Sequence, residues 1–353
     1  MLDEHSGKKV IESHILLRMT SQSKNIVLIV ASLIVSILIC EAILRLFVNV
    51  RDVGPAFSIY DEALGKALKK NFSAVRVTPE FTMSLTTNSL GFRGPEIEDV
   101  GEESVLFLGD SFTLGYGVND GEEFPALIRR KMRLRGDVAT VINAGLGNSG
   151  NGWWLNWLKQ NADRIDPRQV ILQFYGNDLS DNVGEKFYTI GDNEYLIKLP
   201  IPPIDRLRRL QGLIESLPGL SDSYIVGFSR QVVHSFRDIP HWQNSPVQNN
   251  YPVHVGLDEK SRRFAQNLQL KIVEDVMKLL EEKNWDVIVL LVDLHPENNT
   301  ALQDFFRTYD IQPIIISGRN ENPEMYYTVD AHWNAKGHKF AASLLWNKII
   351  GTQ

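Results

Sequence analysis

The first feature of the pattern is an almost uninterrupted apolar run near the amino end. Residues 26–48 begin IVLIVASLIVSILIC, and the run is apolar on every face rather than along one stripe. About 20 such residues span the hydrocarbon core of a bilayer. A buried helix of a soluble protein is the alternative, but such a helix more often has a polar face. We therefore expect a transmembrane helix over residues 25–48.

Charges on either side of this run predict its orientation. More basic residues precede it than follow it, which places residues 1–24 in the cytoplasm and the chain from about residue 50 outside. No small-x-small cleavage site follows, so a signal anchor is expected rather than a removed signal peptide. Glu41 and Arg45 are four positions apart and can pair on one helix face. The basic residues are Lys8, Lys9, Arg18 and Lys24 before the run, and Arg45 and Arg51 at or beyond its end.

From residue 104 the pattern alternates between short continuous apolar runs and longer stretches with helical spacing. Continuous runs indicate strands buried on both faces of a parallel sheet, and the alternation predicts an α/β sandwich. Expected strands begin at residues 105, 139, 170 and 286, with a short fifth at 313–317. Expected helices are Phe124–Arg135, Trp153–Arg164 and Lys260–Lys283.

Two regions interrupt or precede this alternation. Residues 49–103 are rich in turn formers and contain NSLGFRGPE, and we expect a lead-in segment that packs on the main domain. Residues 104–353 form that main domain. Within it, residues from about 183 to 257 are Pro-rich and aromatic and are expected to be an insertion with a few short helices.

Composition narrows the functional classes. The chain has 353 residues, 43% of them hydrophobic, which is enough for one sizeable domain. A formal net charge of -6 argues against a nucleic-acid partner. The single cysteine, Cys40, excludes an intramolecular disulfide and a cysteine-based metal cluster. No other cluster has metal-ligand spacing, so no metal is expected.

Three loops that follow predicted strands contain residues suited to chemistry. Ser111 ends the Gly-Asp-Ser motif at 109–111, where it is either a nucleophile or part of a helix cap. The sequence NAGLGNSGNG at 143–152 permits close backbone approach, as either a site loop or a surface turn. Asn177 lies in Gly-Asn-Asp at 176–178 and is either an oxyanion donor or a turn former.

The fourth motif is Asp-Ala-His at 330–332, before the last expected helix. In an extended loop, Asp330 can orient the His332 ring while the far ring nitrogen acts as a base. A helix cap with an incidental histidine is the alternative. Open α/β sheets place their sites at the carboxyl ends of the strands, and all four motifs fall there or before the final helix. Together they favour one catalytic site.

The ordered set Gly-Asp-Ser, Asn-Ala-Gly, Gly-Asn-Asp and Asp-x-His resembles the four sequence blocks of the SGNH, or GDSL-type, hydrolase superfamily over about residues 104–350. The chain is most similar to bacterial members with one membrane helix and an Asn-x-x-Gly-Phe-Arg segment, here 88–93. The resemblance implies a flavodoxin-like three-layer α/β/α sandwich with a parallel sheet, and no metal or organic cofactor.

The resemblance also implies roles for single residues. Ser111 is the nucleophile, His332 the base and Asp330 its orienting partner. The oxyanion donors are the Ser111 N–H, the Asn177 side chain and a backbone N–H at position 148. The family usually has glycine there, and this chain has Asn148, so Gly147 and Gly150 remain alternatives.

The implied activity is a serine esterase or deacetylase that acts on O-acyl groups through an acyl-serine intermediate. Acylated small molecules or cell-envelope glycans are the expected substrates. An O-acyltransferase with a sugar acceptor and a catalytically idle glycan-binding or assembly protein are the alternatives. Trp153, Trp154 and Trp157 are interpreted as core residues rather than pocket walls, and His338 as structural.

Overall fold

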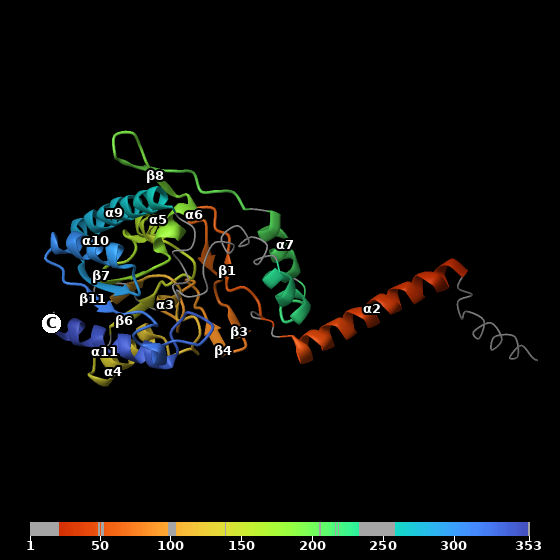
Figure 1. Cartoon of the computed structure of the whole chain (residues 1–353). Helices are drawn as coiled ribbons and strands as arrows, with labels where there is room; N and C mark the ends of the chain where they lie inside the picture. Colours follow the sequence, from red (N-terminus) through yellow and green to blue (C-terminus); the bar gives the residue numbers. More distant parts are fainter. Residues whose placement is uncertain are drawn as a thin grey trace, which may run out of the picture.

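The computed structural model describes residues 21–48, 50, 53–97, 104–137, 139–204, 206–215, 217, 219–232 and 258–351. Most of the expected cytoplasmic tail, the junctions at 51–52 and 98–103, and residues 233–257 of the expected insertion lie outside this set. Figure 1 shows a globular part from which one long helix projects.

A five-stranded parallel sheet forms the centre of the globular part. Its order is β11-β10-β7-β5-β6, the doubly wound order in which the first strand in sequence lies between the second and the third. All pairs are parallel, as the continuous apolar runs predicted. The strands are β5 (Ser104–Leu108), β6 (Thr140–Asn143), β7 (Pro167–Tyr175), β10 (Asp286–Val292) and β11 (Ile314–Ile316).

Helices cover both faces of this sheet. Alternate residues of β5 show why both faces are apolar: Val105 and Phe107 enter one core, and Leu106 and Leu108 enter the other. The first core is closed by α4 (Phe124–Leu134) and α11 (Ala335–Gly351). The second is closed by α5 (Asn151–Asn161), α9 (Glu259–Glu282) and α10 (Pro296–Arg307), with α6 (Asp178–Glu185) packed on α5 and α9. The three-layer α/β/α prediction is confirmed.

Details of the helices differ from the expectation. The helix expected at Trp153–Arg164 begins earlier, at Asn151, because Gly150 ends the preceding loop, and it stops at Asn161. Helix α10 was not predicted, although Pro296 stands at its first position, where proline is favoured. The last helix begins after Asn334, whose side chain accepts from the N–H of Lys336 at 2.8 Å.

The described part of the lead-in contains small antiparallel hairpins, and the described part of the insertion contains one hairpin and short helices. The lead-in contains β1 (Ser58–Ile59) paired with β2 (Ala67–Leu68), and β3 (Ser73–Val77) paired with β4 (Thr82–Thr86). The described insertion contains β8 (Tyr188–Ile190) paired with β9 (Leu196–Lys198), followed by α7 (Arg206–Glu215). These hairpins were not predicted, because strands of two to five residues give little periodicity.

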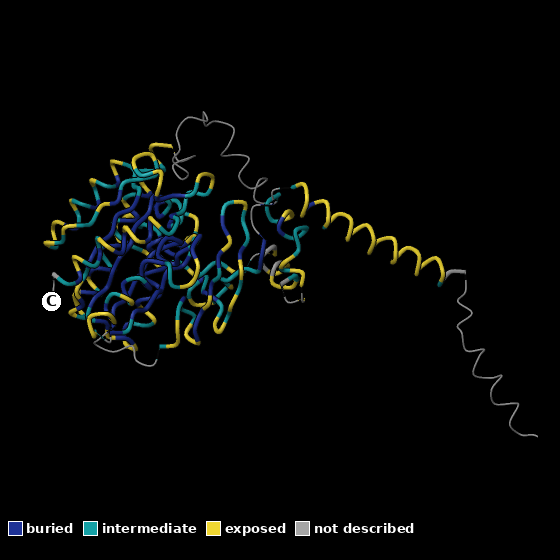
Figure 2. Tube along the Cα trace, turned by 90° about the horizontal axis from the view of Figure 1, so that it is seen from below, coloured by how far each residue is buried: buried dark blue, intermediate teal, exposed yellow. Residues whose placement is uncertain are grey.

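The projecting helix is α2 (Ser21–Phe47). Residues Ser23–Phe47 are long and apolar enough to cross a bilayer, and most of their side chains are exposed, although Leu44 near the carboxyl end is buried (Figure 2). Such a helix is compatible with a single-pass anchor or a signal sequence. Near its end, Arg45 donates to Glu41 at 2.8 Å, the pair expected from their spacing. Glu41 also accepts from the N–H groups of Tyr224 and Ile225, so the insertion contacts the last turns of α2.

Candidate active site

The nucleophile candidate lies where β5 ends. Asp110 caps the short helix α3 (Ser111–Leu114), since its Oδ1 accepts from the Phe112 N–H at 2.9 Å. The capping role in this motif therefore falls to Asp110, and the Ser111 hydroxyl is left for another partner. A side chain at Gly109 would place its Cβ 2.1 Å from the Thr113 Oγ1, so this tight turn requires glycine.

Ser111, His332 and Asp330 form one hydrogen-bonded chain. The Ser111 Oγ lies 2.7 Å from the His332 Nε2, and the His332 Nδ1 lies 2.5 Å from the Asp330 Oδ1. The imidazole ring lies between the rings of Phe112 and Tyr116, with centroids 5.3 and 4.8 Å away. This is the order nucleophile, base and orienting carboxylate that a serine hydrolase uses.

The loop that carries Asp330 is fixed at both ends. The Tyr327 N–H donates to the His332 carbonyl at 3.1 Å, and the Asp330 N–H donates to Glu80 of the lead-in at 2.6 Å. Burial opposes ionisation of Asp330, but its hydrogen bonds to His332 and its electrostatic interaction with that ring prevail and lower the pKa of Asp330 below its usual value. Asp330 therefore stays ionised at neutral pH.

The N–H groups of the expected oxyanion donors make no hydrogen bonds within the described part of the chain. This holds for the Ser111 and Asn148 backbone N–H groups and for the Asn177 Nδ2. Asn177 precedes α6 without capping it, so its side chain is not used as a turn former. The Gly150 N–H instead donates to Glu185 at 3.3 Å and is already occupied.

Position 148 has the backbone conformation that glycine would take. Asn148 has φ of 52°, in the left-handed region where asparagine is tolerated better than other non-glycine residues. The preceding Gly147 lies against the nucleophile, because a Cβ built there would be 3.5 Å from the Ser111 Cβ. Asparagine is therefore compatible with the backbone conformation at position 148. The choice of donor between Asn148 and Gly147 stays a prediction.

The site lies at the point where the strand order reverses. Ser111 follows β5 and Asn177 follows β7, and these two strands are neighbours whose connections leave in opposite directions. Doubly wound sheets open a crevice there at the carboxyl ends of their strands. Asn148 follows β6, the other neighbour of β5, so the topology brings three separate loops together.

Three carboxyl groups lie below and beside this crevice. Burial raises the pKa of Asp110 to about 6 and that of Asp178 well above its usual value. Burial and the charge of Asp110 raise the pKa of Asp181 to about 7, while Lys66 acts in the opposite direction.

The lead-in contacts the loops that hold Ser111, Gly147 and Asp330, which sequence reasoning missed. Arg93 is buried and donates to the carbonyls of Leu114 and Gly115, at the end of α3, at 2.9 and 2.6 Å. Lys66 donates to the Gly147 carbonyl, and Glu80 accepts from Asp330. The Asn-x-x-Gly-Phe-Arg segment at 88–93 was the sequence feature that pointed to this region, but it did not predict which residues the lead-in would contact.

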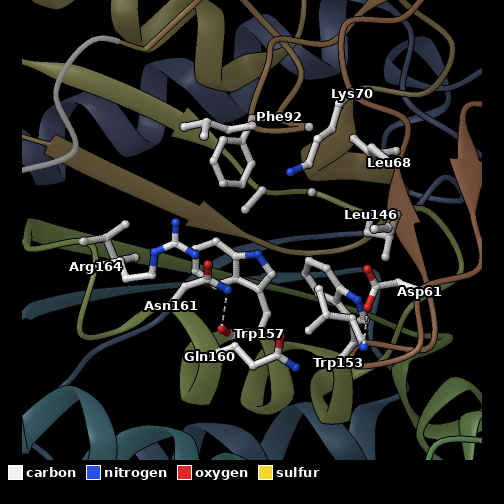
Figure 3. Close-up of a pocket in the computed structure, with 17 residues that line it drawn as sticks. Asp61, Leu68, Lys70, Phe92, Leu146, Trp153, Trp157, Gln160, Asn161 and Arg164 are labelled. Carbon is white, nitrogen blue, oxygen red and sulfur yellow. Dashed lines mark hydrogen bonds between the residues drawn. The ribbon is translucent and has the colours of Figure 1, made fainter.

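A cavity of about 250 Å³ lies between the lead-in and α5 (Figure 3). Trp153 and Trp157 form one side, with ring centroids 6.4 Å apart, and Phe92 and Lys70 lie opposite. Leu146, next to Gly147, is also part of the wall. The core interpretation is right for all three tryptophans, since each is at least 95% buried, but two of them also line this cavity.

His338 is fully buried beside Phe124, and burial lowers its pKa to about 3. A neutral ring that accepts from the Phe124 N–H fits the structural interpretation. Among the described residues, no group of three or more histidine, cysteine, aspartate or glutamate side chains is arranged to hold a metal ion.

No protein-family model matches the chain. An arylesterase from Vibrio mimicus is 26% identical over 113 residues, which cover 29% of this chain and 56% of that protein. The chain thus spans about half the length of this curated relative.

Solved structures similar to this one include several esterases. A two-domain esterase active on acetylated mannans is 14% identical, covering 72% of this chain and 51% of that chain, with a TM-score of 0.39. The psychrotrophic esterase EstA from Pseudoalteromonas is 12% identical, covering 71% and 98%, also at 0.39. AlinE4, an SGNH-hydrolase family esterase, is 17% identical, covering 73% and 98%, at 0.34.

The chain is similar to SGNH-type esterases.

Proposed function

We propose that this protein is a serine ester hydrolase of the SGNH type. The observation that carries the proposal is the chain of short contacts from Ser111 through His332 to Asp330 at the reversal point of the sheet. A serine held 2.7 Å from an oriented imidazole is suited to proton transfer. A protein that only binds its ligand has no need of this arrangement.

The mechanism follows from these distances. The His332 Nε2 takes the Ser111 Oγ proton while Oγ bonds to the ester carbonyl carbon, and the carbonyl π electrons move to oxygen. Collapse of this intermediate breaks the bond to the alcohol, which leaves with the proton from His332. A water molecule, deprotonated by His332, then attacks the acyl-serine and releases the acid and free Ser111. Asp330 stabilises the imidazolium in both halves.

The oxyanion of each intermediate would be held by the Ser111 N–H, the Asn177 Nδ2 and the Asn148 N–H. These donors support the proposal because no described residue uses them. Loss of one such donor costs about 3 to 4 kcal/mol of transition-state stabilisation.

The substrate class we propose is an O-acylated glycan. The cavity beside the site loop combines two indole rings with polar side chains, including Asp61 and Gln160. Its volume of about 250 Å³ is small, enough for one ring or a short chain. Acetyl esters of oligosaccharides are therefore the natural first substrates to compare with aryl esters.

We propose that α2 anchors the protein in a membrane, with its amino end in the cytoplasm and the catalytic domain outside. The apolar length of α2 and the excess of basic residues before it support this arrangement. An external domain would meet envelope glycans directly.

The test is hydrolysis of a short-chain aryl acetate by the full chain in detergent micelles, compared with the Ser111→Ala variant. We expect wild-type turnover, stoichiometric labelling of Ser111 by a fluorophosphonate, and loss of both in the variant. Acetate release from acetylated oligosaccharides then tests the substrate class. Equal, near-zero rates with no labelling of Ser111 would contradict the hydrolase proposal.

A further inference from the structure

Lys66 connects the lead-in to the loop that follows β6. Its Nζ donates to the carbonyl oxygen of Gly147, 81 positions away in the sequence. The Lys66 backbone is fixed as well, because its own carbonyl accepts from the Trp153 Nε1 at 2.8 Å. The ammonium group is therefore brought to Gly147 from a backbone that is tied to α5.

The carbonyl that Lys66 contacts belongs to a particular peptide unit. The Gly147 carbonyl and the Asn148 N–H share one peptide plane, and in a trans peptide they point in opposite directions. A donor that holds the carbonyl on one side therefore turns the N–H to the other side. If this plane rotated by half a turn, a carbonyl oxygen would replace the N–H, and the site would repel an oxyanion.

Within the described part of the chain, the contact with Lys66 is the only hydrogen bond to this peptide unit. Glycine at 147 permits many backbone angles, and Asn148 has φ of 52°. No described residue accepts from the Asn148 N–H. A charge-assisted hydrogen bond is about twice as strong as a neutral one, so the ammonium group is well suited to select one orientation.

We propose that Lys66 is a positioning residue that holds the Gly147–Asn148 peptide with its N–H available to the oxyanion. This inference rests on the proposed esterase function. Lys66 acts through the peptide and does not touch the reacting atoms. Its positive charge also offsets the neighbouring Asp181 carboxyl, an effect that would favour negative charge on the substrate oxygen.

A merely structural role for Lys66 predicts different behaviour. If Lys66 only joined the lead-in to the main domain, its removal would lower the melting temperature and the amount of active enzyme. The affinity of the remaining enzyme for a transition-state analogue would not change. The two roles can therefore be distinguished by the affinity of the folded enzyme for a transition-state analogue.

The experiment compares Lys66→Met and Lys66→Arg with Lys69→Met in the full chain in detergent micelles. Lys69 is a matched control because it belongs to the same segment and its Nζ lies 4.8 Å from the centre of the Phe72 ring. Active sites are counted by fluorophosphonate titration, so that kcat refers to folded enzyme. A trifluoromethyl ketone, which adds Ser111 to form a tetrahedral oxyanion, serves as the analogue.

In Lys66→Met we expect kcat to fall about 10- to 100-fold, somewhat less than on loss of a whole donor, with KM within about 2-fold. The inhibition constant of the ketone should rise by the same factor as kcat/KM falls. Lys66→Arg, which keeps a cationic donor, should recover at least part of the loss, and Lys69→Met should match wild type.

Wild-type hydrolysis together with unchanged kcat and ketone affinity in Lys66→Met would overturn this inference alone. Equal losses in Lys66→Met and Lys66→Arg, without a change in ketone affinity, would also overturn it. Absence of Ser111-dependent hydrolysis in the wild-type chain would remove the proposed function, and this inference with it.

Discussion

The edge of the parallel sheet and the lead-in both build the candidate site, but they contribute different things. Loops that follow β5, β6 and β7 present Ser111, Asn148 and Asn177 to the crevice. The lead-in presents no reacting group. Two of its charged side chains, Lys66 and Glu80, instead contact backbone atoms of the site loops.

This difference reflects how each region is stabilised. The strands of the sheet are buried on both faces, so hydrophobic packing fixes where their loops begin. The lead-in hairpins are short and partly exposed, and charged hydrogen bonds join them to the domain. Substitutions of the catalytic groups should therefore abolish ester hydrolysis. Substitutions in the lead-in should instead disturb the positions of those groups or lower the stability of the fold.

The largest effect is expected at a group of the catalytic chain itself, in Asp330→Asn, in the loop before α11. An amide cannot stabilise the His332 imidazolium and favours the wrong ring tautomer, so kcat should fall about 10³- to 10⁴-fold. Steady-state hydrolysis at pH 7 measures this, with the melting temperature as a control for folding. A loss of less than 10-fold would mean that Asp330 does not orient His332.

Arg93→Met should produce the largest effect on stability from the lead-in. Arg93 donates to the carbonyls of Ser84, Leu114, Gly115 and Val118 and lies 4.0 Å from the buried Glu123 carboxylate. Its removal takes a buried positive charge away from Glu123 and a donor away from four carbonyls, so the free energy of unfolding should fall by about 3 to 5 kcal/mol.

Urea denaturation measures this loss, and the exposed Arg130 provides the matched control, Arg130→Met. Similar urea midpoints for the two variants would show that Arg93 does not tie the lead-in to the nucleophile helix.

Asp181→Asn should stabilise the protein in a pH-dependent way. The folded pKa of Asp181 is about 7, against an ordinary value of 3.8. Between these values the folded chain keeps a proton that the unfolded chain has lost, so stability falls as pH rises through this window. The variant avoids this loss and should gain up to about 4 kcal/mol at pH 8, but almost nothing at pH 4.

Unfolding midpoints at the two pH values measure the effect, with the exposed Asp192→Asn as control. A gain that is equal at pH 4 and pH 8 would contradict a raised pKa as its cause.

Glu80→Ala should weaken catalysis from the lead-in side. The Glu80 carboxylate accepts from the N–H groups of Val329 and Asp330. Removing the carboxylate therefore loosens the loop that carries Asp330, but it removes no reacting group. We expect kcat to fall about 10-fold, the effect of about one charged hydrogen bond. Glu96→Ala, a change at an exposed lead-in residue, should leave kcat as in wild type. Wild-type kcat in Glu80→Ala would show that the loop is fixed without this contact.

The smallest effect is expected in Asn148→Gly. Glycine adopts φ of about 52° without strain and keeps the backbone N–H, so kcat should stay within about 3-fold of wild type. Asn148→Val, which is strained at positive φ, should lose much more. A large loss in Asn148→Gly would point to the asparagine side chain, rather than the backbone, as the functional group.

The sequence alone determined the sheet, the two helical layers and the loops that hold Ser111, Asn177 and Asp330. Strands made of continuous apolar runs are stable only when both of their faces are buried. The carboxyl ends of such parallel strands lie at one edge of the sheet, where the site loops begin. The short hairpins were not predicted because strands of so few residues show little periodicity. Helix α10 was not predicted because most of its residues are polar, so its apolar positions form only a weak pattern.

Only the tertiary structure decided the contacts between distant segments. Ser111 and His332 are 221 positions apart, and no local pattern fixes the 2.7 Å between them. The roles of Lys66, Glu80 and Arg93 depend on which backbone carbonyls and N–H groups the fold leaves without partners. The sequence specifies each residue's chemistry through its side chain, whereas the partner of a charged side chain is set by the packing of the whole domain.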